Sequence, residues 1–541
     1  MGIKILTRRQ VIAIFLFLSP LLFFGYTADD RQHVLQHILW NERGMWSNIE
    51  AIANDILNMQ RFFPLHIMLY STLFKIFDYG NAWLYHGIQI SLNILAYRSF
   101  ARWIKQYLNI KIDDKLLLIF LTTIQFRVSY SDPIVSYFGL MQIFAIAQFE
   151  GMIFLKEYIE EGKLINRIKW MILLTVQLML YELTLFMAPI TFCYLYVNRK
   201  SNMRRCRLAS LIALLMIIVY LLMYLYVKIN NNVKYTGTSV NLAIEEIVGT
   251  TIIEAFGSFP LSYAGYVATQ KLEFNGLLIW GLYFLFMAGM TIVIINREKL
   301  TVDQSTDTRL MTYGTLIWVC SAFSIAFSER YQKELMLGLT YMVSYMQNFG
   351  YVMVAYCITR KYEFRNILIG LCVLTFILNA LVLNETAKID GAKRLAMEVL
   401  TNNNINKEIN FRYLILNEKI MQEENEFVKY IGNGVGEIIY IKISELDKNK
   451  LEIKDNENVG IAIVQTERYG KTSMIVGRYK MEENKIYEAN IFTKDINVAE
   501  EASLKYSGII GKIKRNEYED IYVVKAGDKV SIDGEIRRKF R

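Results

Sequence analysis

Long apolar segments dominate the first 384 residues of the chain, and they constrain its fold more than any other feature. A helix that crosses the hydrocarbon core of a bilayer needs about 20 mainly apolar residues and satisfies its backbone hydrogen bonds internally. The sequence therefore predicts an all-α polytopic membrane domain over residues 1–384, with about 11 transmembrane helices. The candidate spans are residues 10–26, 82–98, 115–127, 137–155, 168–182, 184–198, 208–227, 275–296, 310–327, 335–358 and 364–384.

Basic residues give this predicted domain an orientation. Residues 1–384 hold 33 Lys and Arg against 24 Asp and Glu, whereas residues 385–541 hold 27 of each, so the net charge of +9 belongs to the apolar part. Lys and Arg are enriched in cytoplasmic loops of membrane proteins. With the N-terminus in the cytoplasm, 23 of the 33 basic residues fall on the cytoplasmic side. The charge thus indicates topology in a cell membrane and not a surface for nucleic acid.

The first apolar segment follows Lys4, Arg8 and Arg9, as it does in a secretory signal peptide. A cleavage site after Ala28 would place the bulky Tyr26 at the position where signal peptidases require a small residue. We therefore interpret this segment as a retained transmembrane helix. With an odd number of spans, the soluble C-terminal domain of residues 385–541 is expected outside the cytoplasm.

Two loops on the predicted outer side are long, residues 27–81 and residues 228–274. The first contains an amphipathic stretch, residues 62–77, which we place along the outer membrane interface. In the tail, residues 386–430 have a helical pattern, and later short runs of β-branched and aromatic residues alternate with polar turns. These runs predict a mixed α/β or β-rich domain. They are residues 437–443, 459–464, 472–479 and 487–492.

Acidic and histidine side chains gather after the first span, at its outer end. The adjacent carboxylates Asp29 and Asp30 could provide a general base or ligate a metal, although acids also occur at ordinary helix starts. On a helix, Asp30, His33 and His37 would share one face with the three- and four-residue spacing of some metal ligands. His66 lies in the same outer loop. This pattern is compatible with a binding site for an acceptor or a metal. It is equally compatible with ordinary surface positions.

Further charged residues fall near the predicted outer ends of other spans. Arg61 precedes the interfacial stretch, where it could bind a phosphate through paired hydrogen bonds or anchor the chain at the membrane surface. Arg127 and Asp132 flank a short outer turn. Glu182 follows an apolar segment, and an ionisable residue at membrane depth suggests a functional site. Arg330 belongs to a further outer turn, where Glu329 could neutralise it.

In this order and spacing, the chain resembles the GT-C superfamily of glycosyltransferases that use polyprenyl-phosphate-linked sugars, which includes the protein O-mannosyltransferases. The resemblance covers roughly residues 10–360. Four short motifs carry it: the acidic pair Asp29-Asp30, the stretch Arg61-Phe62-Phe63-Pro64-Leu65, Tyr181-Glu182 followed by Pro189, and Arg330-Tyr331. Tyr181 stands where the family has lysine.

The resemblance implies transfer of a sugar from a polyprenyl-phosphate-linked donor to a glycan, wall polymer or protein outside the membrane. By analogy, Asp29 or Asp30 would deprotonate the acceptor. Arg61 and Arg330 would hold the carrier phosphate, and Tyr331, Glu182 and Arg127 would line the donor site. Some relatives use Mg²⁺ or Mn²⁺ and others use no metal, so the resemblance assigns no cofactor. No metal site is indicated by the five cysteines, whose spacing is neither paired nor typical of zinc.

Two other functions are compatible with a polytopic chain. A transporter or flippase of a lipid-linked glycan would be expected to show related halves and charges at mid-membrane. The ionisable residues here gather instead at one predicted face. A non-catalytic envelope scaffold would need no acidic pair, and it would tolerate replacement of Asp29 and Asp30 by asparagine.

Overall fold

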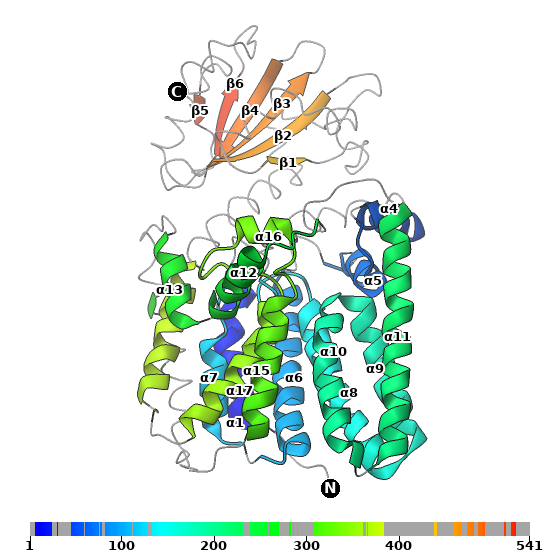
Figure 1. The fold of residues 1–541 in the computed structure, drawn as a ribbon. Helices are drawn as coiled ribbons and strands as arrows, with labels where there is room; N and C mark the ends of the chain where they lie inside the picture. The colour runs from blue at the N-terminus through cyan, green and yellow to red at the C-terminus, as the bar shows by residue number, and fades with distance from the viewer. Residues whose placement is uncertain are drawn as a thin grey trace.

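The computed structural model describes a helical bundle up to residue 382 and a separate set of strands in the tail (Figure 1). The described residues of the bundle are 6–23, 30, 45–58, 60–74, 76–77, 82–110, 112–127, 132–200, 202–230, 239–257, 259–269, four isolated positions between 281 and 289, 308–360, 364 and 366–382. In the tail they are six strands between residues 438 and 525.

Most of the longer helices of the bundle overlap the apolar segments of the sequence, whereas α4, α12, α13 and α16 lie outside them. Their bounds are α1 (Arg8–Leu18), η1 (Ser19–Phe23), α4 (Met45–Asn58), α5 (Pro64–Leu73), α6 (Ala82–Tyr107), α7 (Asp114–Thr122), α8 (Leu140–Glu161), α9 (Leu164–Leu180), α10 (Leu183–Val197), η3 (Asn198–Lys200), α11 (Met203–Asn230), α12 (Ile244–Gly257), α13 (Pro260–Thr269), α15 (Thr308–Phe323), α16 (Glu329–Glu334), α17 (Ser344–Thr359) and a last helix, Asn366–Val382.

Local sequence signals set several helix ends. Thr7 and Gln10 form a capping box at the start of α1, each side chain bonding the other residue's backbone N–H. Asp113 caps α7 by accepting from the Lys115 backbone N–H at 3.0 Å. Gly139 and Gly162 bound α8 with φ of 64° and 76°, a left-handed backbone that suits glycine at both ends.

Several predicted spans are helical over only part of their length, and two of them depart most clearly. Residues 124–127 follow the end of α7 without regular secondary structure, and residues 335–343 form a loop before α17. Gly338 in that loop has φ of 90°, and a Cβ there would lie 2.2 Å from the Ser262 backbone oxygen. The loop therefore packs backbone to backbone against α13, and this close contact replaces the first turns of a helix. The predicted span 275–296 lies almost entirely outside the described residues.

Small residues allow close packing of α15 against α17. A Cβ on Gly350 would lie 2.3 Å from the Trp318 backbone nitrogen, and a Cβ on Gly314 would lie 2.8 Å from the Met353 Cβ. Only glycine permits backbones to approach this closely. Deeper in the bundle, the rings of Phe100, Phe149 and Phe349 lie 4.8–5.2 Å apart and join α6, α8 and α17 in one core.

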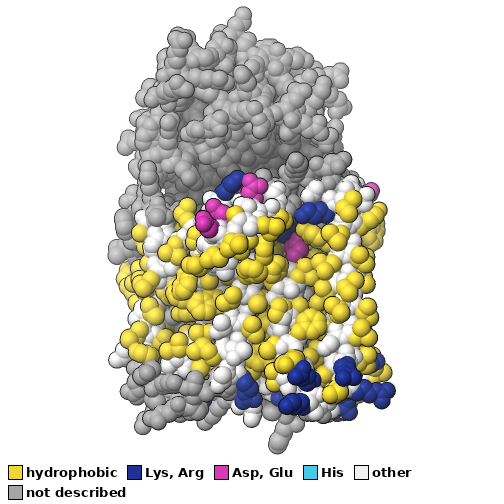
Figure 2. Space-filling model, in the orientation of Figure 1, with side chains coloured by type: hydrophobic (Ala, Val, Ile, Leu, Met, Phe, Trp, Pro, Cys, Tyr) yellow, Lys and Arg dark blue, Asp and Glu magenta, His cyan; other side chains and the backbone are white. Residues whose placement is uncertain are grey.

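Exposed apolar side chains cover much of the outside of the bundle. Figure 2 shows a broad hydrophobic surface, with most of the visible Lys and Arg at the end where Figure 1 places the N-terminus. Among the described residues, α11 is the one helix both long and apolar enough to cross a membrane, and Asn366–Val382 is a shorter apolar helix. On α11, Leu211, Val219 and Leu222 are more than half exposed.

The strands of the tail form one antiparallel sheet. In sequence they are β1 (Ile438–Tyr440), β2 (Val459–Thr466), β3 (Ser473–Lys480), β4 (Lys485–Phe492), β5 (Ile513–Arg515) and β6 (Ile521–Lys525). Their order in the sheet is β1-β2-β3-β4-β6-β5, and every neighbouring pair is antiparallel. The four runs chosen from the sequence overlap β1 to β4, and β5 and β6 match none of them. The expected helical region, residues 386–430, lies outside the described residues.

Candidate functional site

The structure describes eight of the candidate residues: Asp30, Arg61, His66, Arg127, Asp132, Glu182, Arg330 and Tyr331. Asp29, His33 and His37 lie outside the described residues. The eight fall into distinct sets of contacts. The helices α5 and α16, which contain His66, Arg330 and Tyr331, lie at the end of the bundle away from the N-terminus (Figure 1).

Arg61 and Glu182 are brought together from positions 121 residues apart. Arg61 immediately precedes Phe62 and Phe63, and Pro64 starts α5, because proline suits the first position of a helix. Glu182 lies at the start of α10. Its Oε2 accepts a hydrogen bond from Arg61 Nη2 at 3.3 Å, and the two side chains are 17% and 21% exposed. The guanidinium carbon lies 4.5 Å from the Phe63 ring centroid and 5.5 Å from that of Tyr181.

Two more tyrosines complete the surroundings of Arg61. Tyr331 of α16 and Tyr341 of the 335–343 loop have ring centroids 4.2 Å apart, and Tyr341 shares a side-chain hydrogen bond with Tyr181. Both tyrosines lie near Arg61. We call Arg61, Phe63, Tyr181, Glu182, Tyr331 and Tyr341 the Arg61 site. It unites residues from three of the four motifs that resembled the glycosyltransferases.

The guanidinium of Arg61 makes few hydrogen bonds for a group whose side chain is largely buried. A guanidinium carries five N–H donors. The single bond to Glu182 is its one hydrogen bond within the described part of the chain, and its remaining contacts are with aromatic faces. Because burying polar groups without partners is costly, this cation suits an additional anionic ligand.

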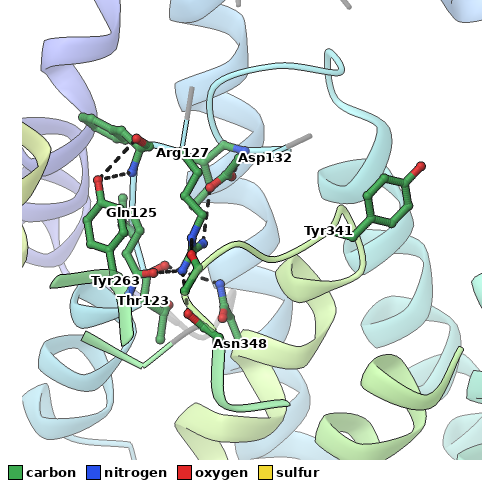
Figure 3. A network of polar contacts seen from close by, with 12 residues as sticks. Thr123, Gln125, Arg127, Asp132, Tyr263, Tyr341 and Asn348 are labelled. Carbon is green, nitrogen blue, oxygen red and sulfur yellow. Dashed lines mark hydrogen bonds and ion pairs between the residues drawn. The ribbon is translucent and has the colours of Figure 1, made fainter. Parts of the chain in front are cut away.

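Arg127 has the opposite environment (Figure 3). Its Nε donates to the Gly338 oxygen at 2.9 Å, and its Nη2 donates to the Gly257 oxygen at 3.0 Å and to the Gln125 side chain. Its Nη1 lies 3.5 Å from Asp132 Oδ2, and its side chain is 2% exposed. These acceptors belong to three separate segments. The geometry favours a structural role for Arg127, which links the turn after α7 to the end of α12 and to the 335–343 loop.

Asp132 is buried beside Arg127 and begins a tight turn. The Ile134 backbone N–H donates to its Oδ1 at 2.9 Å. Burial raises the pKa of this carboxyl, and the nearby Arg127 charge opposes that rise. Asp132 therefore belongs to the same structural network, and no described contact joins it to the Arg61 site.

Asp30 is completely buried in a third set of contacts. The Tyr85 hydroxyl of α6 donates to its Oδ2, and the Tyr137 backbone N–H donates to the same oxygen at 2.9 Å. Tyr137 has φ of 53°, a left-handed conformation that is uncommon for tyrosine. Both contacts use Oδ2 as the acceptor. The Tyr85 hydroxyl and the Tyr137 backbone N–H thus hold the Asp30 carboxyl in one orientation.

Arg330 points to a local partner. Its Nε donates to both carboxylate oxygens of Glu334, at 2.9 and 2.8 Å, and its side chain is 33% exposed. The neighbouring Tyr331 is buried in the Arg61 site. Of the Arg330-Tyr331 motif, only the tyrosine is therefore shown to contact the rest of the site.

Sequence reasoning did not identify Glu254. This side chain of α12 is completely buried, and its two oxygens accept from the Tyr341 backbone N–H at 3.3 and 3.1 Å. Burial raises the pKa of Glu254 to about 8, a rise that the Tyr341 N–H and the Arg127 charge oppose. The available signal was one acid inside the apolar run Ile252-Ile253-Glu254-Ala255-Phe256. Glu254 fixes the backbone from which the Tyr341 ring enters the Arg61 site.

The described residues contain no group of three or more His, Cys, Asp and Glu side chains placed to hold a metal ion. His66 lies in α5, where its ring packs edge-on against Phe63 at 4.9 Å. The arrangement of Asp30 with His33 and His37 stays a prediction, because both histidines lie outside the described residues.

The chain was also compared with known proteins. Protein-family models, curated proteins and solved structures each gave no significant match.

Proposed function

We propose that this chain is a membrane glycosyltransferase that moves a sugar from a polyprenyl-phosphate-linked donor to a glycan, wall polymer or protein outside the cytoplasm. The observation that carries the proposal is the Arg61 site. Arg61, Glu182 and Tyr331 come from separate motifs of the sequence and meet in one place. Arg61 also retains N–H donors that the described residues do not engage.

A phosphate fits these unused donors. Guanidinium groups bind phosphate through two parallel hydrogen bonds, and such charge-assisted bonds are stronger than neutral ones. When the bond between the anomeric carbon and the carrier phosphate oxygen breaks, that oxygen takes the electron pair. A positioned cation stabilises the developing charge and so lowers the barrier. In this proposal Arg61 performs that role, while Arg127 supports the loops around the site.

The acceptor needs a base as it attacks. We assign this role to Asp29 or Asp30, which would take the proton of an acceptor hydroxyl while the anomeric carbon forms its new bond. The fixed orientation of Asp30 supports the assignment, since catalytic groups require a defined geometry.

The membrane part of the proposal is supported by the surface. Apolar side chains cover the visible flank of the bundle, basic residues gather near the N-terminal end, and the elements of the Arg61 site lie at the other end (Figures 1 and 2). A bilayer around the flank, with the N-terminus in the cytoplasm, would put the site and the tail outside. The lipid tail of the donor would then lie in the membrane while its phosphate reached Arg61.

Turnover tests the proposal. Full-length protein in lipid would receive polyprenyl-phosphate-linked sugars and candidate acceptors, and release of the carrier phosphate would be followed. We expect release with the wild type and loss of it with Asp29→Asn and Asp30→Asn in combination, with Glu246→Gln as a matched control. Glu246 is an exposed acid in the first turn of α12. Absence of turnover with every donor, together with unaltered surface glycans in cells carrying the double variant, would refute the proposal.

A further inference from the structure

We infer that Glu182 is an internal competitor for the anion site of Arg61. Its carboxylate pairs with the guanidinium while the site is empty, and it gives way when the phosphate group of a ligand enters. The inference rests on the proposed function, because it assumes that a phosphate binds Arg61.

The ion pair between Arg61 and Glu182 is weakly made. It consists of a single contact of 3.3 Å, whereas charge-assisted hydrogen bonds are usually about 2.7–2.9 Å long. Two other pairs in the bundle are tighter: Arg102 lies 2.5 Å from Glu150, and Arg330 contacts both oxygens of Glu334. A single long contact is easier to replace than a two-point one.

Arg61 has support that does not depend on Glu182. Its guanidinium lies against the rings of Phe63 and Tyr181, and such cation–π contacts hold a cation by its face. The backbone beside it is anchored too, since the Tyr220 hydroxyl of α11 donates to the Phe62 oxygen at 2.9 Å. The edge of the guanidinium therefore stays in position when its carboxylate partner leaves.

Glu182 is able to move. It occupies the N-cap position of α10, yet its side chain makes no capping hydrogen bond to the helix. Its bond to Arg61 is its one side-chain hydrogen bond within the described residues, and its side chain is partly exposed. Rotation of this side chain toward solvent would break no other described hydrogen bond.

The charges predict the effect of removing this competitor. Arg61 and Glu182 together are neutral, so an incoming phosphate either displaces the carboxylate or lies beside a like charge. Glu182→Gln keeps the size of the side chain and removes the repulsion. We expect binding of a phosphate to tighten about tenfold, the order of magnitude for one partly solvated charge pair at close range.

The experiment measures binding and needs no turnover. Full-length protein in detergent would be titrated with farnesyl phosphate, a short polyprenyl monophosphate, and separately with inorganic phosphate. The variants are Glu182→Gln, Glu182→Ala, Arg61→Gln and the control Glu246→Gln. Thermal unfolding checks that each variant is folded, and the alanine variant provides a second test of charge removal. We expect both Glu182 variants to bind farnesyl phosphate more tightly, Arg61→Gln to lose binding, and the control to behave as wild type.

The outcomes separate the inference from the proposed function. Unchanged or weaker binding by both Glu182 variants, together with lost binding by Arg61→Gln, would overturn the competitor role and leave the phosphate site intact. Wild-type binding by Arg61→Gln would overturn both. A gain for inorganic phosphate without any gain for farnesyl phosphate would support the exchange but contradict a lipid-linked ligand.

Discussion

The buried carboxyl of Glu254 makes the stability of the chain depend on pH. Its pKa is raised from 4.5 to about 8, chiefly by burial. The folded state therefore keeps a proton that the unfolded chain releases above pH 4.5. The contribution of the neutral Glu254 carboxyl to the free energy of unfolding is fully present below pH 4.5, and it is lost as the pH rises toward 8. Above pH 8 both states are ionised and the loss is complete.

The size of this change in the free energy of unfolding follows from the shift in the pKa of Glu254. One pKa unit corresponds to about 1.4 kcal/mol, so raising the pH from 6 to 9 would remove on the order of 3 kcal/mol of stability through this one group. Glu254→Gln resembles the neutral acid in shape and can still accept the Tyr341 N–H. The variant should therefore lose this part of the pH dependence and be more stable than the wild type at pH 9.

Thermal unfolding of purified wild type and variant in detergent at pH 6 and pH 9 measures the effect. Comparing the two proteins cancels the titration of all other groups, and Glu246→Gln controls for removal of an exposed acid. We expect the midpoint of Glu254→Gln to fall less between the two pH values. An equal fall in both proteins would refute the reasoning that Glu254 is held neutral by burial.

Three other predictions concern packing and topology. Arg127→Ala leaves Asp132 buried without its cation and should cost about 3–5 kcal/mol, seen as a large drop in the unfolding midpoint, whereas Arg61→Ala should lower it far less; equal drops would contradict the distinction between these arginines. Gly350→Ala should separate α15 from α17, because a Cβ would lie 2.3 Å from the Trp318 nitrogen, and an unaltered midpoint would argue against this packing. Reporter fusions should give cytoplasmic signals after residues 105 and 202 and an external signal after residue 450; a cytoplasmic signal at 450 would refute the odd number of spans.

Several helices and four of the tail strands overlap segments that local sequence patterns had marked, whereas β5 and β6 were not predicted. Apolar runs mark α8, α9 and α11, and β-branched runs mark β2 and β3. Apolar patterns gave a wrong prediction of helix where tertiary contacts replace the hydrogen bonds of a helix. Residues 335–343 are apolar enough for a span, but Gly338 and the contact with α13 make them a loop.

The candidate site was predictable in part for the same reason. Short motifs indicated Arg61, Glu182 and Tyr331, and the structure brings them together. Motifs could not separate Arg61 from Arg127, because the difference lies in the acceptors that long-range folding brings to each guanidinium. Glu254 meets the backbone of Tyr341, 87 residues away, and such a pairing leaves no local pattern.

In the proposed function, Arg61 binds the carrier phosphate of a lipid-linked sugar. The most direct test of this role is kcat/KM for release of polyprenyl phosphate, measured on folded wild type and Arg61→Gln reconstituted in lipid with the same donor and acceptor. Loss of a charge-assisted bond to a buried ligand predicts a decrease of about a hundredfold or more in the variant. An equal kcat/KM for the two proteins would contradict the claim.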